Sequence, residues 1–105
     1  MVRYTDTISG EELYVKVGKA GPAFPGKAGE VYKFYYKDKN RTIRHRIDGP
    51  AIIYADGSKS WWVDGKRHRL DGPTIEYADG DKVWWVDDVF IMHLNKNGQI
   101  INRME

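Results

Sequence analysis

Short apolar runs separated by turn residues recur along this chain in the pattern of β-strands, and no helical period is found in its central part. Two short stretches, 51–55 (AIIYA) and 74–78 (TIEYA), are rich in β-branched and aromatic residues. Each ends at an Asp-Gly pair, which favours a tight hairpin turn because glycine readily adopts positive φ. Return strands are predicted at 59–63 and 82–86, so the central part should consist of two hairpins.

The two hairpins are copies of one sequence unit. Residues 45–63 (HRIDGPAIIYADGSKSWWV) and 68–86 (HRLDGPTIEYADGDKVWWV) are identical at fourteen of nineteen positions, with an offset of 23 residues and no gap. A fixed period of this size is typical of stacked supersecondary units. The sequence therefore predicts an all-β fold, a single antiparallel sheet of tandem 23-residue β-hairpin repeats with N- and C-terminal capping strands.

Each repeat carries a Trp-Trp pair whose members should lie on opposite faces of the sheet, because neighbouring side chains on a strand alternate. We expect Trp61 and Trp84 in the core, because they share a face with a valine in each copy. Trp62 and Trp85 share a face with a position that differs between the copies, and we expect them to point outward. The opposite assignment is the alternative.

The chain is short enough for one domain, residues 1–105, in three parts. Residues 1–40 hold N-terminal strands and a Gly/Pro-rich loop, residues 41–88 hold the two repeats, and residues 89–105 form a C-terminal capping hairpin. Strands in these flanks are predicted at 13–17, 30–37, 90–94 and 99–102.

Two features of the flanks bear on function. The loop at 18–29 contains Gly-Lys-Ala-Gly twice, but no Ser or Thr follows either lysine, which favours a flexible connector over a phosphate-binding loop. A stack of hairpins leaves an edge strand at each end, and the strands at 13–17 and 99–102 are the natural caps. We therefore expect a homodimer or a larger homo-oligomer.

Composition narrows the class of protein further. The chain has no cysteine, which excludes disulfides and thiolate zinc sites, and aromatic residues make up 13%. The formal net charge of +2 divides into +3 over residues 41–73 and −4 over residues 74–90, with the remainder in the flanks. This uneven surface does not suit duplex DNA. No leader or membrane-spanning segment is recognised, so we expect a cytoplasmic protein with no membrane partner.

The repeats resemble MORN repeats, which are β-hairpins of about this length. The resemblance rests on the Asp56-Gly57 turn, the aromatic return strand and Trp62-x-x-Gly65-Lys66-x-His68. It covers the two repeats and implies an array of hairpins. Arg69 and Asp71 stand where the MORN pattern prefers glycine, so phospholipid binding is not carried over. Arrays of this kind are also similar to small uncharacterised proteins of phages and bacteria.

The motif His-Arg-Φ-Asp-Gly-Pro, where Φ is Ile or Leu, holds most of the candidate chemistry. Its histidines and arginines, with the arginine before each, suit a phosphate or carboxylate ligand. The other interpretation is local pairing of these side chains with the aspartate of the turn. The candidate ligand- or partner-binding residues are Trp62, Trp85, Arg46, His68, Arg69, Arg44, His45 and Arg67. Equivalent residues of the two copies stand roughly 10 Å apart, too far to share a metal ion.

No constellation for catalysis is recognised, and neither a cofactor nor a metal is expected. We expect a non-enzymatic recognition protein, such as a phage-encoded inhibitor that binds and blocks a bacterial defence protein in the host cytoplasm. One alternative is a protein that sequesters a small phosphorylated ligand such as a cyclic nucleotide signal. Another is an RNA or single-strand binder.

Overall fold

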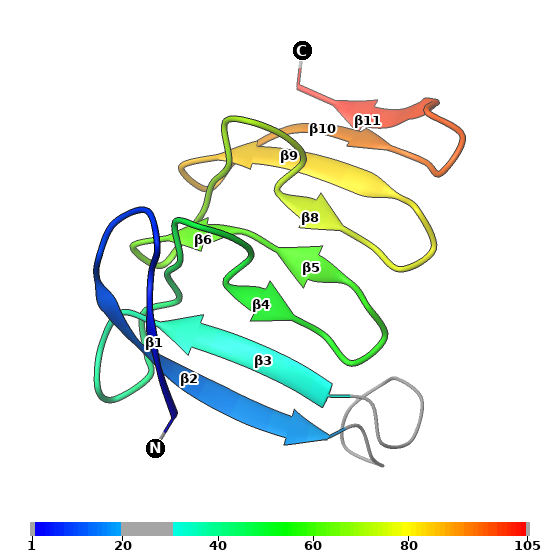
Figure 1. Cartoon of the computed structure of the whole chain (residues 1–105). Helices are drawn as coiled ribbons and strands as arrows, with labels where there is room; N and C mark the ends of the chain where they lie inside the picture. The colour runs from blue at the N-terminus through cyan, green and yellow to red at the C-terminus, as the bar shows by residue number, and fades with distance from the viewer. Residues whose placement is uncertain (1, 20–30, 105) are drawn as a thin grey trace.

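The computed structural model describes residues 2–19 and 31–104, and these residues form strands and no helix. Nine strands make one antiparallel sheet in the order β1-β2-β3-β4-β5-β8-β9-β10-β11, and β6 pairs with β7 beside it (Figure 1). The predicted all-β, antiparallel fold is confirmed. The strands are β1 Val2–Thr5, β2 Glu12–Lys19, β3 Val31–Tyr36, β4 Ile52–Ile53, β5 Lys59–Ser60, β6 Trp62–Val63, β7 Lys66–Arg67, β8 Ile75–Glu76, β9 Lys82–Val86, β10 Val89–Leu94 and β11 Ile100–Arg103.

The Asp-Gly turns form as their sequence predicts. The Tyr54 N–H donates to the Ser58 carbonyl at 2.8 Å, and the Gly57 N–H donates to the Tyr54 carbonyl at 3.0 Å. The same two bonds recur at 77–81 and at 95–99. The glycine of each loop has φ between +82° and +100°, as a three-residue hairpin loop requires at its last position.

The first return strand differs from its prediction. Residues 59–63 divide into β5, inside the main sheet, and β6, which pairs with β7 across Asp64 and Gly65, both at positive φ. The equivalent residues 82–86 form the single strand β9. The difference comes from the next neighbour, because β10 accompanies β9 over its whole length while β7 ends after two residues.

The core lies elsewhere than predicted. A buried cluster of Leu13, Val15 and Tyr35 packs against Tyr4 and Ile53 near the N-terminal end of the sheet. All four tryptophans are half-buried, so the prediction that the first tryptophan of each pair is a core residue is wrong. The physical reason is that Trp61 and Trp62 line two different grooves, which leave part of each ring exposed.

The edges of the sheet also differ in part from the prediction. The N-terminal edge strand is β1, which the sequence pattern missed, and the predicted edge strand at 13–17 belongs to the inner strand β2. At the other end, β11 is the edge strand, and all four of its residues are exposed. No helix that could cross a membrane occurs in the described part of the chain.

Part of the predicted loop at 18–29 is strand, because Gly18 and Lys19 end β2. A Cβ on Gly18 would lie 2.2 Å from the hydroxyl of Tyr32, its cross-strand partner in β3. The tyrosine ring therefore covers the glycine, and only glycine leaves room for it. The remainder of that loop lies outside the described residues.

Candidate functional site

Four of the predicted site residues alternate along one surface of the repeats. The Arg44 guanidinium carbon lies 5.0 Å from the centre of the Trp62 ring, Arg67 lies 5.8 Å from Trp62, and Arg67 lies 3.7 Å from the Trp85 ring. Phe90 then contacts Trp85 edge to face, with ring centroids 5.5 Å apart. We call Arg44, Trp62, Arg67 and Trp85 the arginine–tryptophan ladder. Stacking of this kind holds guanidinium groups over indole faces while their N–H edges remain able to donate.

Asp88 positions Arg67, the arginine that contacts both tryptophans of the ladder. One carboxylate oxygen of Asp88 accepts the Arg67 backbone N–H at 2.8 Å and the Arg67 Nε–H at 3.2 Å. The backbone hydrogen bond and the guanidinium together hold the pKa of Asp88 below its usual range. Asp87 and Asp88 both have positive φ, which agrees with a turn whose glycine is missing. The role of Asp88 in holding Arg67 was missed, and its only sequence signal was an aspartate where the first copy has Gly65.

The two indole N–H groups of the ladder have different surroundings. The Trp62 Nε1–H donates to the Ser60 hydroxyl at 2.9 Å. The second copy has Val83 in place of Ser60, and the buried Nε1 of Trp85 has no partner among the described residues. The buried Nε of Arg44 is also unpaired within the described part of the chain. Of the two ladder tryptophans, only Trp62 thus has a hydrogen-bond acceptor for its indole N–H among the described residues.

A groove of about 390 Å³ lies beside Trp62 and Arg67. Its walls include the exposed rings of Tyr54 and Tyr77 and the hydroxyls of Ser58 and Ser60. Asp56 contributes a carboxylate to the same groove. Aromatic faces, hydroxyls and one charge of each sign suit a protein surface better than a free anion.

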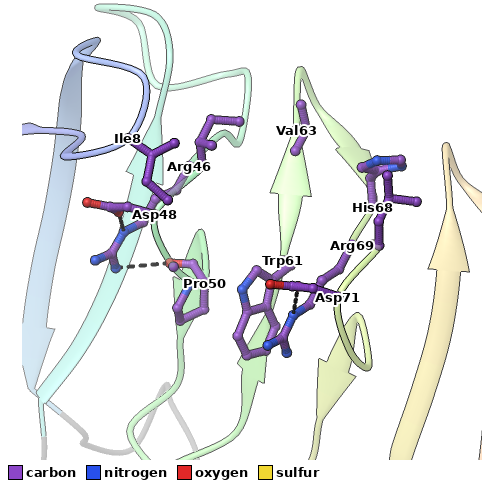
Figure 2. Close-up of a pocket in the computed structure, with 12 residues that line it drawn as sticks. Ile8, Arg46, Asp48, Pro50, Trp61, Val63, His68, Arg69 and Asp71 are labelled. Carbon is purple, nitrogen blue, oxygen red and sulfur yellow. Dashed lines mark hydrogen bonds and ion pairs between the residues drawn. The ribbon is translucent and has the colours of Figure 1, made fainter.

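The His-Arg-Φ-Asp-Gly-Pro motifs form the same local structure twice, and we call each a turn module. Arg46 Nε lies 2.6 Å from an Asp48 carboxylate oxygen, and the equivalent distance from Arg69 to Asp71 is 2.8 Å. In each module the arginine Nη1 also donates to the carbonyl of the motif proline, at 3.2 and 2.9 Å. This geometry is the local pairing that the sequence offered as the alternative to an anion site. The modules flank a second groove, of about 550 Å³, with Trp61 between the two Arg–Asp pairs (Figure 2).

The motif glycines are explained by the arginines. A Cβ on the first module's glycine, Gly49, or on the second's, Gly72, would lie 2.9 Å from the guanidinium carbon of the same module's arginine. Each guanidinium therefore packs directly on the glycine backbone.

The histidines have a structural role in both modules. The Asp64 N–H donates to His45 Nδ1 at 2.9 Å, and the Asp87 N–H donates to His68 Nδ1 at 3.1 Å. Each imidazole thus ties its module to the hairpin turn that follows the Trp-Trp pair. The His45 side chain is buried, and its Nε2 contacts Glu11 at 2.8 Å. His45 therefore cannot reach a ligand.

The fold divides the predicted site residues into separate groups. Trp62, Trp85, Arg44 and Arg67 form the ladder, Arg46, His68 and Arg69 line the groove with Trp61, and His45 is buried. Adjacent residues of an extended strand face opposite ways, so Trp61 and Trp62 line different grooves. Residues 2–19 and 31–104 contain no group of three or more His, Cys, Asp or Glu side chains suited to a metal ion. Comparison with protein-family models, with curated proteins and with solved structures gave no match.

Proposed function

We propose that this chain is a non-enzymatic recognition protein, built on MORN-like 23-residue hairpin units, that binds a protein partner through the arginine–tryptophan ladder. The alternation of arginine and tryptophan along the ladder is the observation that carries the proposal. Tryptophan, tyrosine and arginine are the residues most enriched among interface hot spots. The ladder supplies the first and third of these, and Tyr54 and Tyr77 beside it supply the second.

The charges favour a protein over a small phosphorylated ligand. Arg67 is already paired with Asp88, and Asp56 contributes a further carboxylate to the adjoining groove. A phosphate in this groove would therefore meet one partly neutralised guanidinium, Arg67, and the negative charge of Asp56, which would repel it. A protein surface with an acidic rim would meet the N–H edges of the ladder's arginines with a less dense negative charge, at less cost.

The resemblance to phage and bacterial repeat proteins suggests the partner's source. We propose that the chain is a phage-encoded inhibitor and that its partner is a bacterial host protein with a defence function. Inhibition would occur by occlusion, with the ladder covering a surface that the partner needs. We also propose that the chain acts as a homo-oligomer in the host cytoplasm.

The test is capture of a host protein by matched variants. Arg67→Gln removes the ladder's central charge, and Lys66→Gln removes the neighbouring exposed charge as a control. Wild type and the Lys66→Gln variant should capture the same protein, and Arg67→Gln should bind the purified protein about 30-fold more weakly, as loss of a hot-spot residue does. Equal binding by wild type and both variants would exclude the ladder as the binding surface. A thermal shift with cyclic nucleotides and no captured protein would replace the proposal with the sequestering function.

A further inference from the structure

The first turn module is covered by the chain's own N-terminal hairpin. One carboxylate oxygen of Asp6, in the loop between β1 and β2, accepts the backbone N–H groups of Ile47 and Asp48 at 2.7 and 3.1 Å. Asp48 Oδ1 pairs with Arg46. Its other carboxylate oxygen, Oδ2, accepts the Thr7 N–H at 2.9 Å, the Thr7 hydroxyl at 2.8 Å and the Tyr4 hydroxyl. These bonds leave the Asp48 side chain 4% exposed.

The covering loop also completes the surroundings of Arg46. The Arg46 guanidinium carbon lies 4.3 Å from the Tyr35 ring on the sheet and 4.8 Å from the Tyr4 ring of the hairpin. Its Nη2 donates to the Tyr4 hydroxyl at 3.3 Å. Sheet and hairpin thus each supply one aromatic ring to the arginine.

The second turn module has the same internal geometry and no cover. Arg69 rests on Trp61, with its guanidinium carbon 3.8 Å from the ring centre, as Arg46 rests on Tyr35. However, the Asp71 side chain is 86% exposed, and Leu70 is 80% exposed. The Leu70 backbone N–H has no acceptor within the described part of the chain, and the Asp71 N–H contacts only the carboxylate of Asp71 itself. The equivalent pair in the first module bonds to Asp6.

We propose that the second turn module is a binding site for a loop of a partner protein that presents an aspartate flanked by hydroxyl-bearing residues. The first module shows the ligand chemistry, because the N-terminal loop is that ligand in intramolecular form. This site lies on the groove lined by Trp61 and is separate from the ladder. A test of this site is therefore independent of whether the ladder binds a partner.

Each group of the open module specifies one feature of the partner loop. The Leu70 and Asp71 N–H groups are placed to donate to a carboxylate, as those of Ile47 and Asp48 do to Asp6. The Asp71 carboxylate requires donors, which in the first module are Thr and Tyr hydroxyls and a backbone N–H. Arg69 needs no ligand to hold it, because Glu76 accepts from its Nη1 at 3.0 Å and Trp61 supports its face. The module is therefore organised before binding, which lowers the entropic cost of association.

The same groups disfavour a free phosphate as the ligand. Phosphate offers acceptors to the two backbone N–H groups but lacks the several donors that the Asp71 carboxylate needs. Its negative charge is also denser than that of one carboxylate, so Asp71 and Glu76 would repel it more strongly. An aspartate-bearing loop supplies its own donors together with its carboxylate, so the open module selects for a peptide loop.

The chain's own loop provides the probe for a test. A backbone-cyclised peptide carrying residues 2–15 (VRYTDTISGEELYV) is titrated into ¹⁵N-labelled full-length protein. The amide resonances of Leu70 and Asp71 should shift saturably, as new hydrogen bonds form at those N–H groups. Asp71→Asn in the protein, or Asp6→Asn in the peptide, should weaken binding about tenfold, as loss of a hydrogen bond to a charged group does. Because Asp71 is exposed, its variant tests binding without disturbing the fold.

Two controls separate this site from other sources of shifts. A peptide in which residues 2–15 are scrambled should leave both amides in place, and inorganic phosphate at the same concentration should do the same. Shifts confined to Ile47 and Asp48 would show exchange at the first module only and would overturn the proposal. So would phosphate shifts at Leu70 and Asp71 without peptide shifts, or equal affinity of the native and Asp6→Asn peptides.

Discussion

The unpaired indole of Trp85 allows a sharp test of how the two copies are stabilised. Val83 occupies the place of Ser60, whose hydroxyl accepts from Trp62, and both positions are buried, at 5% and 4% exposure. Replacing Val83 with threonine retains the branched shape and adds an acceptor two residues before Trp85. A buried donor without a partner costs about 1–3 kcal/mol, and exchanging one methyl group for a hydroxyl costs roughly 1 kcal/mol of hydrophobic transfer. We therefore expect Val83→Thr to be neutral or to raise the free energy of unfolding by about 1 kcal/mol.

Val15→Thr is the matched control, because Val15 is equally buried, at 5% exposure, and lies in a core cluster that includes neither Trp85 nor Arg44, the residues with a buried unpaired donor. It should lower the free energy of unfolding by about 1–3 kcal/mol, since its hydroxyl gains no partner. Ser60→Ala should lower it by a similar amount, because Trp62 then loses its acceptor. Urea denaturation measures all three, and each kcal/mol corresponds to about 4–8 °C in the melting temperature of a small domain. Equal losses for Val83→Thr and Val15→Thr would refute the reasoning.

Three further predictions concern pH, packing and assembly. Burial alone would raise the pKa of Asp48, but hydrogen bonds from Tyr4, Thr7 and Arg46 outweigh it and hold the pKa well below its usual range. The stability from this depressed pKa is complete near neutral pH and declines as pH falls below about 4, so the melting temperature should fall there, less steeply in Asp48→Asn. Gly18→Ala should cost about 1–3 kcal/mol in urea denaturation, because its Cβ meets a tyrosine ring, and a loss below 0.5 kcal/mol would count against that close contact. Light scattering should show a homo-oligomer, and Ile101→Lys on the exposed edge strand β11 should yield monomers; a monomeric wild type would contradict the assembly.

The sequence predicted the parts of the fold that depend on local chemistry. The positive-φ glycines of the hairpin loops, the strand at 82–86 and the strand near 90–94 follow from turn residues and alternation. The burial of the tryptophans was predicted wrongly, because variation at the position of Ser60 and Val83 was interpreted as exposure of that face. Both residues are buried, and they represent two different ways of filling the space beside a ladder tryptophan.

The sequence identified most residues of the candidate site but did not predict which of them lie together in the fold. Pairing of Arg46 with Asp48 is local and could be proposed from the motif. The contact between Asp6 and the backbone of Asp48 joins positions 42 residues apart, and no period or motif in the sequence connects them. The signal that could have revealed this contact was Asp6 itself, whose carboxylate caps its own loop through the Ile8 and Ser9 N–H groups.

The N-terminal loop also sets the valency of the array. Residues 2–19 and 31–104 contain one such loop, and it covers the first turn module. Each 23-residue unit inserted after the first would add one open module, at steps of roughly 10 Å along the sheet. The count of free sites would therefore be the count of units minus one. Two units give a monovalent chain, and longer arrays would gain affinity for repeated epitopes through avidity without any change in the individual contact.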